Sequence, residues 1–453
     1  MPVSRSWDFP IIQIVGASPL QRESLPMKLP NILVSVAFML AAPVHAAQPL
    51  GDEPIAVPKV IKQGIDFVYV DPQVSSAARH QRPHNWLQRI FSSNREQGGP
   101  NPLFQQLADG LDRYRATWGS LPTVRIPAGP PLKLGASGTR VRLLRQRVGL
   151  PDSATYDRNL ADAVSRFQYV HGIAPDGMAG RATVAALNLG PEPFEQRIAI
   201  NMERAWRLPA TGKFDRYVIV DAGSAQAMLI ARDKVADSMR VVVGSPKTPT
   251  PMMAVLLRRA RSNPYWNVPP ELIRSLTAKR VLQQGPAYIA NFHYEILSDW
   301  SATAQSLDPR AINWKAVAAG KSEIRVRQLP GPWNSMGAMK FEMPNDFGIY
   351  LHDTPHKELF SQDNRWLSNG CVRLQDYRRF ADWVFREPPG PGTATEETFE
   401  LARPVPVLMT YLTVAPGEGS VVFRPDPYHL DAKALPQMFG HVAVRDAALE
   451  GRH

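Results

Sequence analysis

The spacing of apolar residues changes near residue 214, and this change constrains the fold more than any other feature of the sequence. Upstream, apolar residues recur every three or four positions, as on one face of a helix. From Tyr217 onward they form short runs bounded by Gly, Pro and Asn, which is typical of β-strands. A chain of 453 residues also exceeds one ordinary hydrophobic core. We therefore predict a multidomain protein, with a helical part followed by a sheet-rich α+β part.

Two helical segments are predicted first, a scaffold over residues 81–130 and a compact module over residues 131–190. The scaffold has two apolar stripes at helical spacing, which are packing faces rather than a cofactor site. These stripes are Trp86, Ile90 and Phe91, then Leu103, Leu107, Leu111 and Tyr114. A linker helix is expected over residues 191–213. The 43 prolines of the chain favour loops and linkers over long helices.

The module over residues 131–190 is predicted to contain three short helices, each with one apolar face. The three faces are Val141, Leu144 and Val148; Leu160, Val164 and Phe167; and Ala182, Ala186 and Leu189. Asp157 is a suitable N-cap for the second helix. Asp176-Gly177 is a turn signal before the third helix. The module is therefore expected to be all-α.

The sheet-rich domain is predicted over residues 214–428. Residues 217–220 and 227–230 form a hairpin around the Gly223-Ser224 turn. Further strands are expected at residues 239–243, 324–327, 348–352, 405–414 and 421–423. Few helices separate these strands, so we expect a β-sandwich-like, mostly antiparallel sheet. A polar insert with some helical character interrupts it at about residues 271–322.

An export signal is predicted to begin at Met27 rather than at residue 1. A short basic start is followed by an apolar run and by small residues around Ala46, where cleavage would occur. The apolar run is too short to span a bilayer comfortably. Residues 1–26 are then an extension from a mis-assigned start, and residues 27–46 are a signal peptide. An uncleaved signal, acting as a membrane anchor, is the alternative.

Two segments are expected to lack regular structure. Residues 48–80 are rich in proline and weakly patterned, which predicts an extended or disordered lead-in. Residues 429–453 are expected to be a loose tail.

Cys371 is the only cysteine of the chain, so it cannot form an internal disulfide. It is a buried side chain, a link to another molecule, or a nucleophile. Structural cysteines of exported proteins usually come in pairs, which favours a nucleophile here. Gly370 before it leaves the sulfur accessible, and residues 374–385 after it look helical. A cysteine at the start of a helix would have a lowered thiol pKa.

A base is available upstream of this cysteine. In a strand over residues 348–352, Tyr350 and His352 point to one face, and Ile349 and Leu351 point to the other. His352 on this strand is the candidate base, which a thiol nucleophile needs. Each residue alone also fits a structural role, either as a small buried hydrophobe or as a hydrogen-bonded histidine.

This stretch resembles the L,D-transpeptidases with a YkuD-type catalytic domain. Their signature is a His, a gap of under twenty residues, and then Ser/Thr-x-Gly-Cys-x-Arg/Asn. His352 precedes Cys371 by 19 positions, with Ser368, Gly370 and Arg373 in place. Residues 263–269, 327–332, 340–341 and 352–355 resemble the large, scaffold-bearing members of Gram-negative bacteria. The resemblance extends from about Leu111 to Tyr428.

The helical module over residues 131–190 resembles the three-helix peptidoglycan-binding module. The residues in the expected order are 163–168, Gly172, Asp176-Gly177, Gly180 and 183–188. The resemblance implies a groove for glycan or stem peptide, whereas the residues themselves also fit a purely structural role. In the large family members the insert at residues 271–322 caps the active site. The sequence alone also allows a surface excursion.

The resemblance implies peptidoglycan cross-linking through a thioester. Cys371 attacks the carbonyl at the L-centre of diaminopimelate in a tetrapeptide stem, D-alanine leaves, and a second diaminopimelate amine resolves the thioester. His352 takes the thiol proton and passes it to the leaving amine. The backbone amides of Gly370 and Cys371 and the hydroxyl of Tyr350 are the candidate oxyanion donors.

The remaining signature residues have more than one interpretation. In the family the backbone carbonyl of the residue after the histidine orients it, which assigns that role to Asp353. Ser368 is either a catalytic hydroxyl or one that bonds the loop. Arg373 either positions a substrate carboxylate or braces the loop. Asn369 stands where many members have a second histidine, so His352 is the sole base.

The expected partners are peptidoglycan stem peptides and glycan, in the periplasm. Carbapenems are expected inhibitors, and lipoproteins or other cell-wall enzymes are further candidate partners. The net charge of +11 suits an acidic cell wall. No nucleic-acid partner is expected, because no basic run is interleaved with aromatic residues and no helix-turn-helix spacing is present.

No cofactor and no metal are expected. The sequence has no phosphate-cradling glycine loop, no His-Glu-x-x-His motif and no paired cysteine ligands. Two functional alternatives stay open beside the transpeptidase. One is an L,D-carboxypeptidase, or an enzyme that attaches or detaches lipoproteins, using the same thioester. The other is a non-catalytic cell-wall-binding scaffold.

Overall fold

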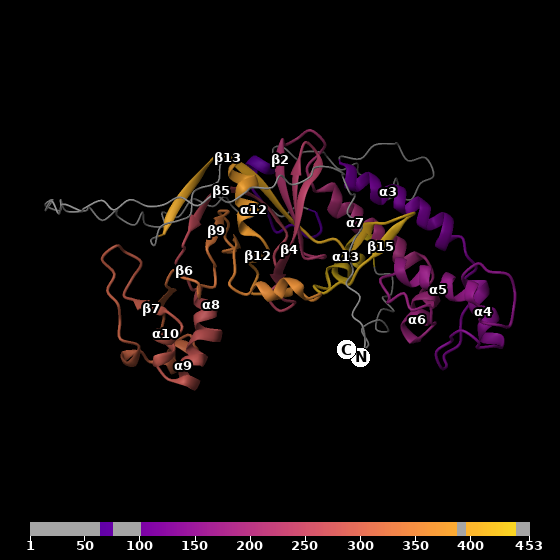
Figure 1. Ribbon diagram of the computed structural model, residues 1–453, viewed down its shortest axis with the longest axis horizontal. Helices are drawn as coiled ribbons and strands as arrows, with labels where there is room; N and C mark the ends of the chain where they lie inside the picture. Colours follow the sequence, from indigo (N-terminus) through magenta and orange to yellow (C-terminus); the bar gives the residue numbers. More distant parts are fainter. Residues whose placement is uncertain (1–63, 76–100, 387–395, 441–453) are drawn as a thin grey trace, which may run out of the picture. The chain divides into compact units, whose positions relative to one another are not determined.

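The computed structural model describes residues 64–75, 101–386 and 396–440 (Figure 1). The predicted extension, the signal peptide and the stripe of Trp86, Ile90 and Phe91 lie outside these ranges. None of the helices within them is long and apolar enough to cross a membrane. All described residues fall in one compact unit, Leu50–His453.

The three helices of the predicted module are present as α4 (Thr139–Arg147), α5 (Arg158–Val170) and α6 (Arg181–Leu189). The first two predicted apolar faces are buried. Asp157 caps α5, since its carboxylate accepts a hydrogen bond from the Leu160 N–H at 2.9 Å. The face of α6 differs from the prediction, because Ala182 is exposed. Its buried residues are Thr183, Val184, Ala186 and Leu187.

The scaffold and the linker are also helical, as α3 (Pro102–Tyr114) and α7 (Glu192–Trp206). Asn101 caps α3 by accepting a hydrogen bond from the Phe104 N–H at 3.0 Å. Its amide also donates to the Ala205 carbonyl at 2.8 Å, which ties the start of α3 to the end of α7. Leu107, Leu111 and Tyr114 of the predicted stripe are buried in a core shared with the module.

The C-terminal part of the chain returns to this helical core, which corrects two predictions. β14 (Val414–Pro416) pairs with β15 (Val421–Phe423), and both contribute buried residues to the helical core rather than to the sheet-rich domain predicted to reach residue 428. α13 (Leu430–Phe439) follows, so the tail predicted to be loose over residues 429–453 contains a helix. Asp431 and Met438 of this helix are buried, and Met438 packs in the helical core.

The lead-in predicted to be extended or disordered over residues 48–80 is structured at residues 64–75. β1 (Tyr69–Val70) pairs in parallel with the start of β5 (Met253–Ser262), and a helical turn, α1 (Pro72–Ser75), follows. Tyr69 and Val70 are buried in the core of the sheet. Burial of these apolar side chains outweighs the weak local pattern.

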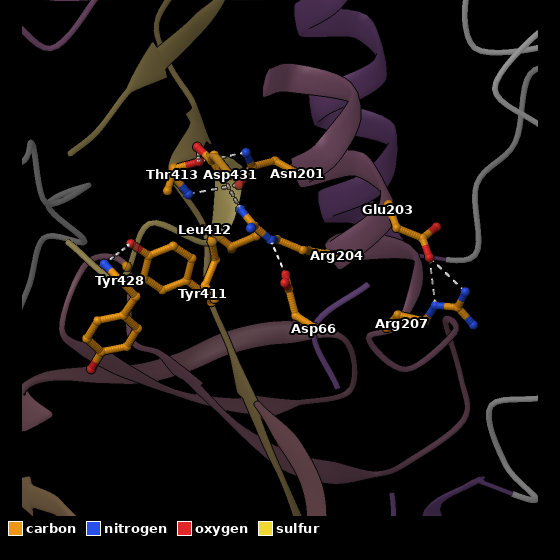
Figure 2. A network of polar contacts seen from close by, with 12 residues as sticks. Asp66, Asn201, Glu203, Arg204, Arg207, Tyr411, Leu412, Thr413, Tyr428 and Asp431 are labelled. Carbon is orange, nitrogen blue, oxygen red and sulfur yellow. Dashed lines mark hydrogen bonds and ion pairs between the residues drawn. The ribbon is translucent and has the colours of Figure 1, made fainter. Parts of the chain in front are cut away.

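A buried polar network joins the lead-in, the linker helix and the C-terminal helix (Figure 2). Arg204 of α7 forms ion pairs of 2.5 Å with Asp66 and with Asp431, and its side chain is 1% exposed. Asp431 also accepts a hydrogen bond from the Thr413 hydroxyl at 2.6 Å. Asn201, one turn before Arg204, donates to the same hydroxyl at 2.9 Å. Three segments that are distant in sequence therefore share one charge cluster.

Ten strands among the described residues form one sheet in the order β1-β5-β13-β2-β3-β4-β12-β10-β9, with β11 beside β4. The strands not yet given are β2 (Arg216–Asp221), β3 (Gln226–Ala231), β4 (Lys234–Gly244), β9 (Met339–Glu342), β10 (Leu351–His352), β11 (Trp366–Ser368), β12 (Val372–Leu374) and β13 (Glu397–Thr410). β9 also pairs with β5, so the path of strands closes on itself. Figure 1 shows β13, from the yellow end of the chain, beside β5 and β2.

Most pairs of this sheet are antiparallel, and the predicted hairpin is present as β2 and β3. Parallel pairing occurs at β1–β5, β2–β13, β4–β11 and β10–β12. α12 (Tyr377–Phe385) buries Phe380, Ala381 and Val384 in the core of the sheet. The multidomain α+β class is therefore confirmed, whereas the closure of the sheet was not predicted.

The insert is a folded subdomain with its own hydrophobic core. β6 (Trp266–Asn267), β8 (Arg325–Gln328) and β7 (Tyr294–Leu297) form a separate three-stranded sheet. Its helices are α8 (Pro270–Leu272), α9 (Ala278–Gln284), α10 (Ala287–Asn291) and α11 (Trp314–Ala318). The strand predicted at residues 324–327 for the main sheet belongs here instead, and the subdomain is wider than the predicted 271–322.

We predict that Arg204→Met lowers the free energy of unfolding by about 3–5 kcal/mol, because it removes the buried cation that pairs with Asp66 and leaves Asp431 with Arg197 alone. Denaturant unfolding followed by tryptophan fluorescence measures this loss. The matched control is Arg142→Met, since Arg142 pairs with Asp152 through side chains that are 50% and 70% exposed. That change should cost less than about 1 kcal/mol. Equal losses for the two variants would show that the buried network does not stabilise the fold.

Candidate active site

His352 lies at the end of β10, the two-residue strand Leu351–His352. The observed strand is shorter than the predicted one, which covered residues 348–352, but the predicted alternation is present. Ile349 and Leu351 are 5% and 0% exposed and belong to the core of the sheet. His352 is itself only 2% exposed. The candidate base therefore lies in the protein interior, at the edge of the hydrophobic core.

The backbone carbonyl of Asp353 holds the His352 ring. The imidazole Nδ1 donates a hydrogen bond to this carbonyl at 2.5 Å. This is the arrangement that the family resemblance implies. The Asp353 carboxylate has different partners, because it accepts a hydrogen bond from the Ala338 N–H at 2.9 Å and pairs with the Lys357 ammonium. The side chain of Asp353 thus connects two neighbouring segments, and its carbonyl orients the imidazole.

Cys371 lies in the loop between β11 and β12, which corrects one prediction. The sequence predicts a helix directly after the cysteine, over residues 374–385. Instead the strand Val372–Leu374 follows, and α12 begins at Tyr377. Val372 and Leu374 are both fully buried in the core of the sheet, with the intervening residue on the other face. Because the field of a helix terminus falls off within one turn, it does not lower the pKa of Cys371.

Parallel pairing of β10 with β12 brings the base and the nucleophile together. The partners in register are Leu351 with Val372 and His352 with Arg373. The Val372 N–H donates to the Tyr350 carbonyl at 3.0 Å, so Cys371 lies beside the start of β10. The Cys371 thiol donates to the Gly348 carbonyl at an S–O distance of 3.6 Å. His352 in β10 and Cys371, directly before β12, are thus brought close together although they are 19 positions apart in sequence.

Burial keeps both groups uncharged in the resting protein. It raises the pKa of the Cys371 thiol, although a hydrogen bond from the Tyr350 backbone and the charges of Lys340 and Arg373 act in the opposite direction. Burial, and then the charge of Arg373, lower the pKa of His352 to about 3. The resting pair at neutral pH is a thiol and a neutral imidazole. In the part of the chain that the structure describes, no hydrogen bond joins these two side chains.

Ser368 closes the loop that carries the nucleophile. Its hydroxyl donates to the Cys371 carbonyl at 2.6 Å and accepts from the Gly370 N–H at 3.1 Å. Ser368 is 3% exposed, and these contacts match its loop-bonding interpretation. The Gly370 amide is therefore engaged in the resting protein. The Cys371 N–H has no hydrogen-bond acceptor within residues 64–75, 101–386 and 396–440.

Gly370 is the one position of this loop where the backbone requires glycine. Its φ is +115°, a conformation that side-chain-bearing residues rarely adopt. An added Cβ would also lie 3.1 Å from the Ile349 side chain. The glycine of the signature is thus explained by backbone geometry and close packing.

Arg373 is half-buried next to the thiol, and the structure describes no carboxylate paired with it. Its Nε is buried without a hydrogen-bond acceptor among the described residues. Burial lowers the pKa of the guanidinium, which nevertheless stays charged at neutral pH. Since no described hydrogen bond connects Arg373 to the loop, the geometry favours its interpretation as a binding group for a carboxylate.

Lys340 of β9 supports the same site, and the sequence did not single it out as a site residue. It lies opposite His352 in the β9–β10 register. Its Nζ is 3.9 Å from the centroid of the Tyr350 ring and 3.0 Å from the Glu342 carboxylate. The cation and the ring together fix the position of the Tyr350 side chain. The charge of Lys340 also favours the thiolate form of Cys371.

Thr250 and Tyr428 support the loop that carries Cys371 through hydrogen bonds, and the sequence did not identify either residue. The Thr250 hydroxyl donates to the Gly370 carbonyl at 2.7 Å. The Tyr428 hydroxyl accepts a hydrogen bond from the Thr250 N–H at 3.4 Å. The sequence patterns assign no helix or strand to Thr250, and they mark Tyr428 only as the end of the sheet-rich domain. No local pattern relates either residue to Cys371.

Within the described ranges, no three His, Cys, Asp or Glu side chains are grouped closely enough to hold a metal ion. The chemistry that the residues themselves support is nucleophilic attack by sulfur. In such an attack Cys371 would be the nucleophile, His352 the proton acceptor, the Cys371 N–H an oxyanion donor, and Arg373 a charge for substrate binding.

Comparison with known proteins gives two family matches. Residues 215–405 match the L,D-transpeptidase catalytic domain of the YkuD family. Residues 142–187 match the family described as "Putative peptidoglycan binding domain". The first range contains all seven candidate site residues considered above, from Tyr350 to Arg373.

A protein of Haemophilus influenzae named "Putative L,D-transpeptidase" is 32% identical over 278 residues, which are 58% of this chain and 55% of the relative. The chain thus spans about half the length of the curated relative that it matches. Among solved structures, an L,D-transpeptidase from Mycobacterium smegmatis is 13% identical over 43% of this chain and 58% of that chain, with a TM-score of 0.23. An LD transpeptidase in complex with imipenem is 11% identical over the same shares, with a TM-score of 0.22.

The catalytic-domain match and the peptidoglycan-binding match occupy the sheet-rich and the helical parts predicted from the sequence. The chain therefore contains an L,D-transpeptidase catalytic domain of the YkuD type at residues 215–405, preceded by a peptidoglycan-binding-like domain at residues 142–187.

Proposed function

We propose that this protein is an L,D-transpeptidase that cross-links peptidoglycan stem peptides through a thioester on Cys371. The observation that carries the proposal is the parallel pairing of β10 with β12, inside the matched catalytic domain. This pairing brings together a candidate nucleophile, a candidate base and a guanidinium that has no carboxylate partner among the described residues. A scaffold without catalysis would not need these three groups at one site.

Acylation begins from the neutral pair. Because Nδ1 of His352 donates to the Asp353 carbonyl, Nε2 is the nitrogen left to accept a proton. The Cys371 sulfur attacks the carbonyl carbon of the stem peptide while its proton moves to His352. The C–N bond then breaks, and His352 passes the proton to the leaving amine of D-alanine. Since burial disfavours charge on both groups, proton transfer accompanies the attack rather than preceding it.

The oxyanion that forms during this attack needs a hydrogen-bond donor. The Cys371 N–H is the favoured candidate, because Gly370 uses its own N–H to bond Ser368. The Tyr350 hydroxyl, whose ring lies against Lys340, is a second candidate. A donor that is already in place needs no reorganisation when charge develops.

The substrate class follows from charge and from the second domain. The stem peptide carries carboxylates, which the guanidinium of Arg373 is suited to bind, since its Nε has no acceptor in the described part of the chain. The domain at residues 142–187 would hold the cell wall near the active site. Glycan and stem peptides are therefore the proposed partners, in the periplasm, after export by the signal beginning at Met27. Carbapenems should acylate Cys371, because their strained carbonyl is a comparable electrophile.

The main alternative functions are hydrolysis of the thioester and transfer of its acyl group to a protein amine, since both proceed through the same thioester. Its outcome depends on which nucleophile reaches the thioester, and therefore on the subdomain from Trp266 to Gln328. The resemblance implies that this subdomain covers the active site. The transpeptidase is preferred because the matched family is named for that reaction.

The reaction product tests the proposed cross-linking activity. The mature protein, incubated with purified disaccharide tetrapeptide, should form a cross-linked dimer with release of D-alanine, as measured by mass spectrometry. Cys371→Ala should abolish the product, because no other thiol is present in the chain. Formation of tripeptide without any dimer would show carboxypeptidase activity instead of transpeptidation. If neither a product nor a thioester adduct forms, the remaining interpretation is a non-catalytic scaffold that binds the cell wall.

The pH dependence of alkylation tests the charge state of Cys371 and His352. Alkylation of Cys371 by iodoacetamide should keep accelerating as the pH rises above about 9, because burial holds the thiol pKa above its ordinary value. There should be no reactive plateau near neutral pH, since burial keeps His352 neutral down to about pH 3. The mass of the adduct, followed over time at each pH, gives the rates.

Arg373→Met should slow this alkylation at about pH 8, because it removes a cation that favours the thiolate. Arg378→Met is the matched control, since Arg378 is exposed on α12. Full reactivity that begins below about pH 6 would instead indicate a thiolate–imidazolium pair and contradict the neutral resting state.

A further inference from the structure

The peptide unit between Gly370 and Cys371 is held by a side chain outside the catalytic signature. Its carbonyl oxygen accepts a hydrogen bond of 2.7 Å from the Thr250 hydroxyl. Thr250 lies in the loop between β4 and β5, and it is 1% exposed. The N–H of the same peptide unit belongs to Cys371, and no acceptor for it lies in the described part of the chain.

A trans peptide is planar, and its C=O and N–H point in opposite directions. Whatever fixes the Gly370 carbonyl therefore also fixes the Cys371 N–H. The carbonyl points toward the buried Thr250, so the N–H points away from that buried side. Gly370 has a φ of +115°, and glycine restricts backbone rotation less than any other residue. Without a bond to its carbonyl, this peptide unit could turn.

We propose that Thr250 is a positioning residue that aims the Cys371 N–H at the developing oxyanion, and that Tyr428 holds Thr250 in place. The inference rests on the proposed acyl transfer at Cys371. It assigns a role in the reaction to two residues of segments that the His–Cys signature does not include.

The direction of the Thr250 hydroxyl is fixed by its second partner. The Gly244 N–H donates to the Thr250 Oγ1 at 2.9 Å. A hydroxyl that accepts from an N–H has one proton to donate, and the Gly370 carbonyl is the acceptor it reaches. An added Cβ on Gly244 would lie 2.2 Å from the Thr248 carbonyl oxygen, so the two ends of this loop approach closely. The hydroxyl is thus held rigidly.

Tyr428 completes the support. Its hydroxyl donates to the Gly244 carbonyl at 2.6 Å and accepts from the Thr250 N–H at 3.4 Å. Burial raises the pKa of Tyr428 to about 12, so the phenol remains a donor over the physiological range. The loop between Gly244 and Thr250 is thereby bonded to a residue near the C-terminus.

Tyr428 is itself anchored to the buried charge cluster of Arg204. Its ring stacks on that of Tyr411 at a centroid distance of 5.1 Å, and its N–H donates to the Tyr411 hydroxyl at 3.0 Å. The Arg204 guanidinium lies 5.2 Å from the centroid of the Tyr411 ring. Figure 2 shows the hydroxyl of Tyr428 pointing away from this cluster. The support for Gly370 therefore extends to the core shared with the helical part.

Acylation and alkylation of Cys371 separate this role from a merely structural one. In acylation by imipenem, sulfur bonds to the β-lactam carbonyl carbon, the ring C–N bond breaks, and the nitrogen takes the thiol proton through His352. This reaction forms an oxyanion. In alkylation by iodoacetamide, sulfur bonds to carbon and iodide leaves, so no oxyanion forms. Only the first reaction needs the Cys371 N–H as a donor.

We predict that Thr250→Val slows acylation by imipenem by about 100-fold, the loss typical of one oxyanion donor. The rate of alkylation by iodoacetamide should change less than about threefold, because the thiol and His352 are untouched. Thr250→Ser keeps the hydroxyl and should restore acylation. Tyr428→Phe should fall between the two threonine variants, since it removes the support of Thr250 but not its hydroxyl. Mass spectrometry of the full chain measures both adducts.

Equal slowing of both reactions in Thr250→Val would indicate general damage to the loop and overturn the inference. Unchanged acylation would overturn it as well, since the hydroxyl would then be dispensable. In both cases the proposed function stands if the wild-type protein is acylated. If imipenem and tetrapeptide both fail to acylate the wild-type protein, the proposed function fails and the inference fails with it.

Discussion

The parallel pairing of β10 with β12 is the contact on which the active site depends. It is short, but Leu351 and Val372, its register partners, are both fully buried, so hydrophobic packing holds it in place. A shift by one residue would turn these side chains out of the core and turn His352 inward. The core therefore fixes the register, and the register places the imidazole next to the strand that follows Cys371.

The same burial determines the charges of the pair. A charged thiolate and imidazolium would each lose hydration in this setting, so the resting site holds neutral groups. The positive charges of Lys340 and Arg373 lower the free-energy cost of forming the thiolate and raise that of forming the imidazolium. The site is thus poised to stabilise negative charge, first on sulfur and then on the oxyanion. A substrate carboxylate bound at Arg373 would in turn ease protonation of His352.

Local sequence patterns predicted the parts of this protein that local interactions determine. The β2–β3 hairpin, the buried faces of α4 and α5, and the Asp157 cap all depend on neighbours in sequence. The sequence could propose the His352–Cys371 pair because the two residues are only 19 positions apart. The helix predicted over residues 374–385 is present from Tyr377 to Phe385, but its start was placed too early, because Leu374 fits a buried strand equally well and only tertiary pairing decides between the two.

The elements that the sequence did not reveal depend on distant partners. α13 was taken for a loose tail because its stability comes from Asp431, whose cation lies in α7, more than two hundred positions upstream. β8 was assigned to the wrong sheet because an isolated strand does not specify its partners. The buried network of Arg204 has no sequence signature for the same reason.

Distance in sequence also explains why the support of the nucleophile was missed. Thr250, Tyr428 and Gly370 belong to three segments that meet only in the folded chain. Their contacts are hydrogen bonds to backbone atoms, which any residue could offer, so the motif around Cys371 gives no sign of them. The Tyr428–Tyr411 stack joins these bonds to the cluster of Arg204, in the core that includes the peptidoglycan-binding domain. The geometry at Cys371 therefore depends on the packing of the helical part as well as on the sheet.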